Sequence, residues 1–392
     1  MPIMYRHILA ELAKVFFLAL AGLTMLMLVV GMVREAQMQN IPINQVIKLI
    51  PYILPDALRF AVPVTLLLAV SFVYGRMSGA NEILAVKAMG ISPLVLLWPT
   101  LIAAFLLSLV SVWLNDVAVS WGRSGVRRVV IQSIEEIAYS MLRAQRSYGA
   151  RNFSINVLAV EGRRLIEPSI TFQAGRDSPL VVIRAEEAEL RADHQQRVLR
   201  ITLRNGSLHV GGKLCYQFPS VEQREIPIGD DDHWSPSPST MPLWQIPQQL
   251  AAQRQAVYEM EHDLALRASY HLLCGEFQEL GSPKWSQQLT SLHLKRETIH
   301  RLLTEPHRRW AGGFSCLCFA LVGAPLAMRL RHREYLTIFF LCFAPILVIY
   351  YPVLILSIGG AKSGALPPYA VWLGNLLLLA AGLVSLRKVL RY

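Results

Sequence analysis

Six long apolar segments divide this chain of 392 residues. About 20 apolar residues cross a bilayer as an α-helix, and the six segments reach or approach that length at residues 15–33, 60–74, 94–114, 310–328, 336–358 and 366–386. The second segment is short, but apolar residues before it extend the helix past Pro55 and Pro63. The pattern predicts six membrane spans, the first of them a retained anchor rather than a cleaved signal peptide.

The polar sequence between the third and fourth spans, residues 116–309, has a different periodicity. Short alternating segments over residues 150–228 are typical of a small β-sheet, a sandwich or a jelly roll. Asn205-Gly206 stands between two such segments and predicts a tight hairpin turn. A polar linker follows at 229–246, and residues 247–303 have apolar positions at helical spacing with a break at Gly281-Ser282-Pro283. This last part predicts a helical hairpin whose apolar face packs on the sheet or, alternatively, on a partner protein.

Basic residues set the expected orientation. The short segments at the two termini, at 75–93 and at 329–335 carry ten Lys or Arg residues, whereas the short segments at 34–59 and 359–365 carry four. Because cytoplasmic loops are enriched in Lys and Arg, we expect both termini in the cytoplasm. The predicted domains are therefore residues 1–115 with spans one to three, an extracytoplasmic domain at 116–309, and residues 310–392 with spans four to six.

Composition narrows the function. The formal net charge is +11, but the basic residues are scattered over both sides of the membrane, so we expect no nucleic acid partner. The sequence has no Gly-x-x-x-x-Gly-Lys-[Ser/Thr] loop for nucleotide phosphates, and the span interiors have no charged residue for an ion relay. Neither a nucleophile site nor a set of metal ligands stands out. We therefore expect a protein that is not an enzyme and has no cofactor and no metal.

The segment between the second and third spans, residues 75–93, carries the sharpest signal. Gly90 suits the end of a short helix over about 80–89, and Ser92-Pro93 suits the start of the third span. Asn81 is placed to cap the short helix, which puts Glu82 in its positive first turn. A carboxylate there either pairs with an arginine of a cytoplasmic partner or only complements the helix dipole.

This segment closely resembles the coupling segment of the lipopolysaccharide export permeases LptF and LptG. The matching string is Gly75-Arg76-x-Ser78-x-x-Asn81-Glu82-Ile83-x-Ala85-x-Lys87-Ala88-x-Gly90. Residues 5–12, 115–116, 185–206 and 307–326 are also similar to parts of that family, whereas the hairpin at 247–303 departs from it. The outer loop at 359–364 resembles LptF more than LptG.

The resemblance implies a fold and a set of partners. The expected fold is an α-helical membrane protein of the bacterial inner membrane, with six transmembrane helices, an extracytoplasmic β jelly roll and the helical hairpin between spans three and four. The implied partners are a second LptF/LptG-type permease, a cytoplasmic ABC ATPase dimer that hydrolyses the ATP, and periplasmic jelly-roll bridge proteins. The implied substrate is lipopolysaccharide, which enters from among the membrane lipids between the first span of one permease and the fifth of the other. The residues assigned to ATPase coupling are Arg76, Asn81, Glu82, Ala85, Lys87 and Gly90.

Substrate contacts are expected at the outer mouth. Arginine suits phosphate because its planar fork bonds two oxygens, and the candidates are Arg34, chiefly, with Arg308 and Arg309. The alternative is that such arginines only extend towards the membrane interface. The open edge for a bridge protein is predicted at strands 157–161 and 198–203. An exporter of another lipid or lipoprotein, or an anchored periplasmic scaffold without transport, remains the alternative function.

Overall fold

The computed structural model divides the chain into two compact units. It describes all residues except 1, 40–46, 124, 127–128, 130–133, 151–152, 173–180, 194–197, 211–213, 219–221, 228–237, 331–333 and 392. One unit is helical and comprises residues 1–28, 54–122 and 236–392; the other comprises 29–53 and 123–235 and contains the sheet. Half of the predicted linker, residues 229–237, lies outside the described residues, and the other half contains two short 3-10 turns.

The six predicted spans are confirmed as helices. Within the described residues, six helical stretches are long and apolar enough to cross a membrane: Ile3–Gln37, Ile47–Gly79, Leu94–Gly122, Pro283–Arg329, Tyr335–Ser363 and Pro368–Leu390. The α-helices that form them are α1 (Pro2–Gln39), α3 (Ile50–Gly79), α5 (Leu94–Val117), α10 (Pro283–Arg329), α11 (Tyr335–Pro345), α12 (Tyr351–Ser363) and α13 (Leu373–Arg391). Short π-helical turns continue α5 and join α11 to α12, at Ala118–Arg123 and Ile346–Tyr350.

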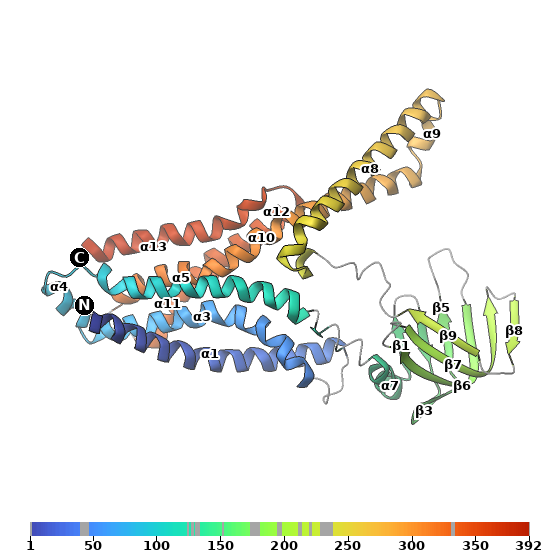
Figure 1. Cartoon of the computed structure of the whole chain (residues 1–392), viewed down its shortest axis with the longest axis horizontal. Helices are drawn as coiled ribbons and strands as arrows, with labels where there is room; N and C mark the ends of the chain where they lie inside the picture. The colour runs from blue at the N-terminus through green and yellow to red at the C-terminus, as the bar shows by residue number, and fades with distance from the viewer. Residues whose placement is uncertain are drawn as a thin grey trace. The chain divides into compact units, whose positions relative to one another are not determined.

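The spans of the helical unit pack around one apolar core. Leu66, Leu67, Leu96 and Phe319 are among its most deeply buried side chains. The two chain ends and the short helix α4 (Glu82–Ala88) lie at the same end of this unit (Figure 1).

The second helix of the predicted hairpin and the fourth span are one helix. The sequence predicts a boundary between about residues 303 and 310, but α10 runs without interruption for 47 residues. The polar run from His307 to Arg309 interrupts the apolar pattern but not the helix, and within it Arg308 and Arg309 form ion pairs. The N-terminal half of α10 pairs with α8 (Ile246–Leu273), and the short α9 (Phe277–Leu280) closes the turn (Figure 1).

The N-terminal half of α10 packs against α8 along a narrow apolar seam. Val257 and Leu264 of α8 are buried, and Met260 contacts Ser291 of α10. Arg296 also forms an ion pair of 2.8 Å with Glu261 across the seam. We call α8, α9 and residues 283–304 of α10 the helical arm.

Within the described residues of the second unit, nine antiparallel strands form one sheet. In chain order they are β1 (Ser147–Ala150), β2 (Phe153–Asn156), β3 (Ala159–Glu161), β4 (Arg164–Ile166), β5 (Ser169–Phe172), β6 (Val181–Asp193), β7 (Val198–Val210), β8 (Leu214–Phe218) and β9 (Glu222–Pro227). The order is β1-β2-β5-β6-β4-β3, with β7 on the other edge of β6 and β8 and β9 both on β7. Such a curled, fully antiparallel sheet agrees with the predicted β domain.

The predicted Asn205-Gly206 hairpin is wrong. The two flanking segments are one strand, β7, which pairs along its whole length with β6. Asn205 takes a left-handed φ of 48°, and its amide donates to Glu186 Oε2 on β6 at 3.0 Å. On the other edge, β7 pairs with β9 up to Leu203 and with β8 from Gly206. The dipeptide therefore marks the point at which a long strand changes partners.

The pairing of β7 also corrects one predicted open edge. Residues 198–203 cannot receive a strand from another protein, because β6 occupies one side and β9 the other. β3, which contains most of the other predicted edge, pairs with β4 and with no other described strand. The apolar face of the sheet is covered by α7 (Ile134–Gln145), whose Tyr139 hydroxyl donates to Arg163 O at 2.7 Å and accepts from Leu190 N at 2.9 Å.

Candidate functional site

The coupling segment, residues 75–93, is folded against the ends of the spans that lie beside the two chain ends (Figure 1). Ile83 and Val86 of α4 are buried in the main core. Gly90 ends the helix with a left-handed φ of 75°, and the N–H of Ile91 donates back to Val86 O at 3.3 Å, as in a Schellman cap. Gly90 therefore ends the short helix, as predicted.

The start of α4 differs from the prediction. Asn81 occupies the position before the helix, but its φ of 60° is left-handed and its side chain makes no capping hydrogen bond. A side-chain cap needs an extended backbone at that position. Asn81 instead supplies a tight left-handed turn after α3, which asparagine tolerates better than most residues.

The outer surface of α4 is open to a partner. Asn81, Glu82, Ala85 and Ala88 are exposed, and the larger apolar side chain of Leu84 is 52% exposed. The Glu82 carboxylate makes no hydrogen bond or ion pair with any residue that the structure describes. Small alanines beside an exposed leucine and a carboxylate form a flat surface with one charge, which suits docking of another protein.

Arg76 and Lys87 face inward instead. Arg76 Nη1 lies 3.0 Å from Glu11 Oε2 of α1, and Lys87 Nζ donates to Val389 O of α13 at 2.9 Å. Ser78 also donates to Met328 O of α10 at 2.8 Å. Of the six predicted coupling residues, these two cations fasten the segment to the first and last spans, and the other four lie on or beside the exposed surface.

Arg309 is the most buried of the three predicted substrate arginines. Its side chain is 2% exposed, and its Nη1 lies 2.8 Å from Asp116 Oδ1 of α5. Its Nη2 donates to the carbonyl of Met241, in the chain that leads into α8. The sequence contained the residue Asp116 in a family-like position but no signal that it pairs with Arg309, which is 193 positions away.

Arg308 belongs to the same cluster but is half-buried. Its Nη2 and Nε donate to Glu305 Oε2 at 2.7 and 3.1 Å. Glu305 is buried, and Lys362 at the end of α12 lies 3.6 Å from its other oxygen. Sequence reasoning missed Glu305 and Lys362, although a glutamate three and four residues before two arginines on a helix is a signal for ion pairs.

Arg34 lies in the last turns of α1 and is exposed. It makes no hydrogen bond or ion pair with a described residue, so its guanidinium keeps all its donors. Arg34 belongs to the unit that contains the sheet, whereas Arg308 and Arg309 belong to the helical unit.

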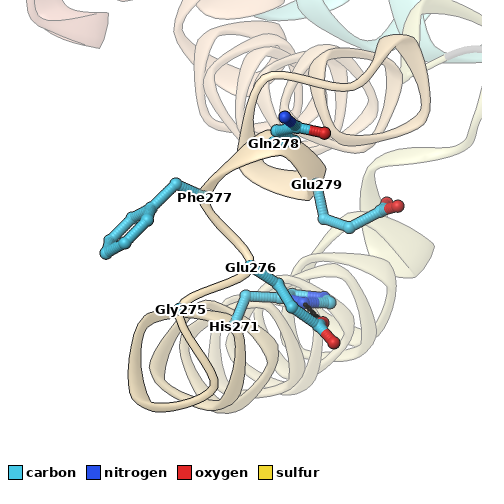
Figure 2. A pocket seen from close by; sticks show the side chains of 6 residues that line it. All are labelled: His271, Gly275, Glu276, Phe277, Gln278 and Glu279. Atoms are coloured by element: carbon cyan, nitrogen blue, oxygen red, sulfur yellow. Dashed lines mark hydrogen bonds and ion pairs between the residues drawn. The ribbon is translucent and has the colours of Figure 1, made fainter.

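A hollow lies at the tip of the arm, and we assign no binding or catalytic role to it. His271 Nδ1 lies 3.0 Å from Glu276 Oε2, while Phe277 points away from the other lining residues (Figure 2). In the part of the chain that the structure covers, no group of three or more His, Cys, Asp and Glu side chains could hold a metal ion.

Comparison with known proteins supplies the family. The family model of the lipopolysaccharide export system permease LptF/LptG matches residues 6–388, which include all six spans, the sheet and the helical arm. No curated protein matches the chain. One model covers both permeases, so the preference for LptF stays a prediction. The chain therefore belongs to the LptF/LptG family of permeases of the lipopolysaccharide export system, and it is a multi-pass protein of the inner membrane.

Proposed function

We propose that this chain is the permease subunit of an ATP-driven transporter that extracts lipopolysaccharide from the inner membrane and passes it to a periplasmic bridge. It acts with a second LptF/LptG-type permease and a cytoplasmic ABC ATPase dimer, with both of its termini in the cytoplasm. The observation that carries the proposal is the exposed surface of α4, which is braced by the inner ends of the spans in a member of this family.

The division of labour follows from the energy required. Each CH₂ group of an acyl chain that leaves the bilayer costs about 0.8 kcal/mol, and lipopolysaccharide has several acyl chains. The sequence has no phosphate loop of its own. A separate ATPase must therefore supply the work, and the permease must transmit it.

Glu82 is the proposed anchor for the ATPase. Its carboxylate has no partner among the described residues and lies beside Ala85 and Leu84, so an arginine of the ATPase can reach it without a steric obstacle. Arg76 and Lys87 support this contact indirectly, because they fix the coupling segment to α1 and α13.

Arg34 is the proposed contact for substrate phosphates, with Arg308 as a second candidate. Arg34 is exposed and Arg308 is 26% exposed, and a planar fork binds a phosphate through two oxygens. Arg309 contributes indirectly by fixing the helix that carries Arg308, since its own side chain is buried and paired.

The sheet is proposed to dock a periplasmic bridge protein of similar β structure. The β3 strand offers N–H and C=O groups on the side away from β4, and an added strand would satisfy them. The sheet would then continue from one protein into the next and extend an apolar surface for acyl chains.

The test is ATP-dependent release of lipopolysaccharide from proteoliposomes that contain this chain, its partner permease and the ATPase. Release above the level of an ATPase-dead control is expected, and its absence would count against the proposal. Native mass spectrometry of lipids that co-purify distinguishes lipopolysaccharide from another lipid substrate. Stable purification with no bound ATPase at all would favour a periplasmic scaffold.

A further inference from the structure

The α10 helix joins the two ends of the helical unit. Its 47 residues correspond to about 70 Å. At its inner end, Met328 accepts a hydrogen bond from Ser78 and packs in the same core as Ile83 and Val86 of the coupling helix. At its outer end it forms half of the helical arm, so one helix connects the coupling segment with the arm.

This helix has a weak point where it leaves the span. Pro306 lies inside α10. A proline in a helix interior has no N–H for the carbonyl four residues earlier, and it usually kinks the helix or allows it to bend. If α10 is to transmit movement along its length, contacts with neighbouring segments must keep it straight at Pro306.

A clasp of four groups braces it. Arg309 Nη1 lies 2.8 Å from Asp116 Oδ1, and Arg309 Nη2 donates to Met241 O. The same Asp116 oxygen accepts from the backbone N–H of Leu243 at 3.1 Å. The clasp thus joins the outer end of α5, the fourth span and the chain that enters α8, and Met241 is buried against Ile246 and Leu302 beside it.

Breaking the contacts of the clasp costs free energy. Arg309 is 2% exposed, so breaking its contacts would leave a buried guanidinium without its carboxylate partner and the Met241 carbonyl without its donor. Buried charges that lose their partner are strongly penalised. Glu305 adds to the brace one turn away, because it holds Arg308 and faces Arg309 and Lys362.

We propose that Arg309 and Asp116 are positioning residues that lock the arm to spans three and four across Pro306, so that the arm and α10 move as one lever between the coupling segment and the periplasm. The arm is thereby a rigid extension of the fourth span rather than a loosely tethered insertion. Its movement follows the coupling helix, and whatever the arm contacts in the periplasm receives that movement.

The chain provides a label at the tip of the arm. Cys274 is exposed there, whereas Cys316, Cys318 and Cys342 are buried. We would attach spin labels to Cys274 and to a Ser363→Cys substitution at the exposed end of α12, in a Cys215→Ser background. The full-length protein in nanodiscs then gives a distance distribution by double electron–electron resonance. The two labels lie about 40 Å apart along the arm, estimated at 1.5 Å per helical residue, which suits the method.

The variants are Asp116→Asn and Arg309→Gln, with Arg309→Lys as the conservative form. The control is Arg301→Gln, on the same helix, whose ion pair with Glu297 is exposed. We expect a narrow distribution for the parent and for Arg301→Gln. In the two clasp variants the population with a displaced arm should rise about tenfold or more, because each 1.4 kcal/mol of lost coupling is about a factor of ten. Arg309→Lys should fall between, since lysine keeps the charge and loses the fork.

Unchanged distributions in both clasp variants, with normal thermal stability, would overturn the proposal. A merely structural role would lower stability and leave the distribution of the folded protein narrow, which also counts against it. In the assembled transporter, the clasp variants should release less lipopolysaccharide per ATP hydrolysed, with ATPase activity retained. The distance measurement needs no transport, so it tests the lever even if the proposed function fails.

Discussion

Replacement of Gly313 by alanine tests how tightly the fourth span packs against the third. A Cβ atom built at Gly313 would lie 2.8 Å from the backbone nitrogen of Val112 and 2.9 Å from its Cα, and it would also collide with its side chain. Two of these atoms belong to the backbone of α5, so no rotamer change removes the collision. The substitution must push the two helices apart just below the clasp.

The expected cost follows from two opposing effects. An added methyl group in a well-packed core costs about 1–3 kcal/mol, and the upper end applies here because a backbone must move. Alanine is the better helix former by about 1 kcal/mol, which offsets part of that cost. We therefore expect Gly313→Ala to destabilise the protein by about 1–2 kcal/mol net, from the same two estimates.

The neighbouring glycine provides a matched control. A Cβ atom at Gly312 would meet Asn115 Nδ2 at 3.7 Å, which is an ordinary contact. Gly312→Ala should thus be neutral or slightly stabilising through its helix propensity. The assay is the rate of thermal inactivation of both variants in identical nanodiscs, because large membrane proteins unfold irreversibly. Equal rates for the two variants would refute the close packing of α5 and α10.

The remaining predictions concern the three proposed contacts. Glu82→Ala should weaken co-purification of the ATPase, by about 2 kcal/mol or more if the carboxylate is paired at the interface, whereas Glu82→Asp should weaken it less. The control is Glu334→Ala, which removes another exposed glutamate. Unchanged assembly of the Glu82→Ala variant would mean that Glu82 only complements the helix dipole. A photo-crosslinking amino acid at Arg34 should trap lipopolysaccharide in cells, and trapping of phospholipid only would mean that the arginine merely reaches the interface. Cysteines in Ala159–Glu161 should crosslink to the bridge protein, whereas those in Val198–Leu203 should not, because β7 is paired on both sides. If neither segment crosslinks in an active complex, the sheet edge is not the docking site.

The membrane part of the fold was predictable because hydrocarbon leaves the backbone few choices. A lipid-exposed segment must satisfy its own backbone hydrogen bonds, so 20 apolar residues imply a helix. The end of the short helix at Gly90 was also predictable, because a helix often ends at a left-handed residue and glycine adopts that conformation without strain. These inferences rest on local sequence, and local sequence was sufficient for them.

The errors arose where distant pairing decides the local structure. Asn205-Gly206 has the composition of a hairpin turn, but the segments on either side of it pair with β8 and β9 rather than with each other. No pattern within residues 198–210 reveals that choice. The boundary near residue 305 failed in the same way, because the partners that keep α10 helical through its polar stretch include Asp116 and Met241, far away in the sequence.

The arginines at the outer mouth show why burial has to be known before a charge is assigned a function. The sequence favours Arg34 over Arg308 and Arg309 only by its place at the end of the first span, and all three have the chemistry to bind phosphate. The structure separates them by the partners that they already have: the Asp116 carboxylate and the Met241 carbonyl for Arg309, Glu305 for the half-buried Arg308, and no described partner for Arg34. A cation that is already neutralised in the protein interior must break those contacts to bind a ligand, whereas an exposed one need only shed water. The fork of Arg309 therefore joins Asp116 and Met241, whereas Arg34 has no described partner and keeps its donors for the phosphate contact that we propose.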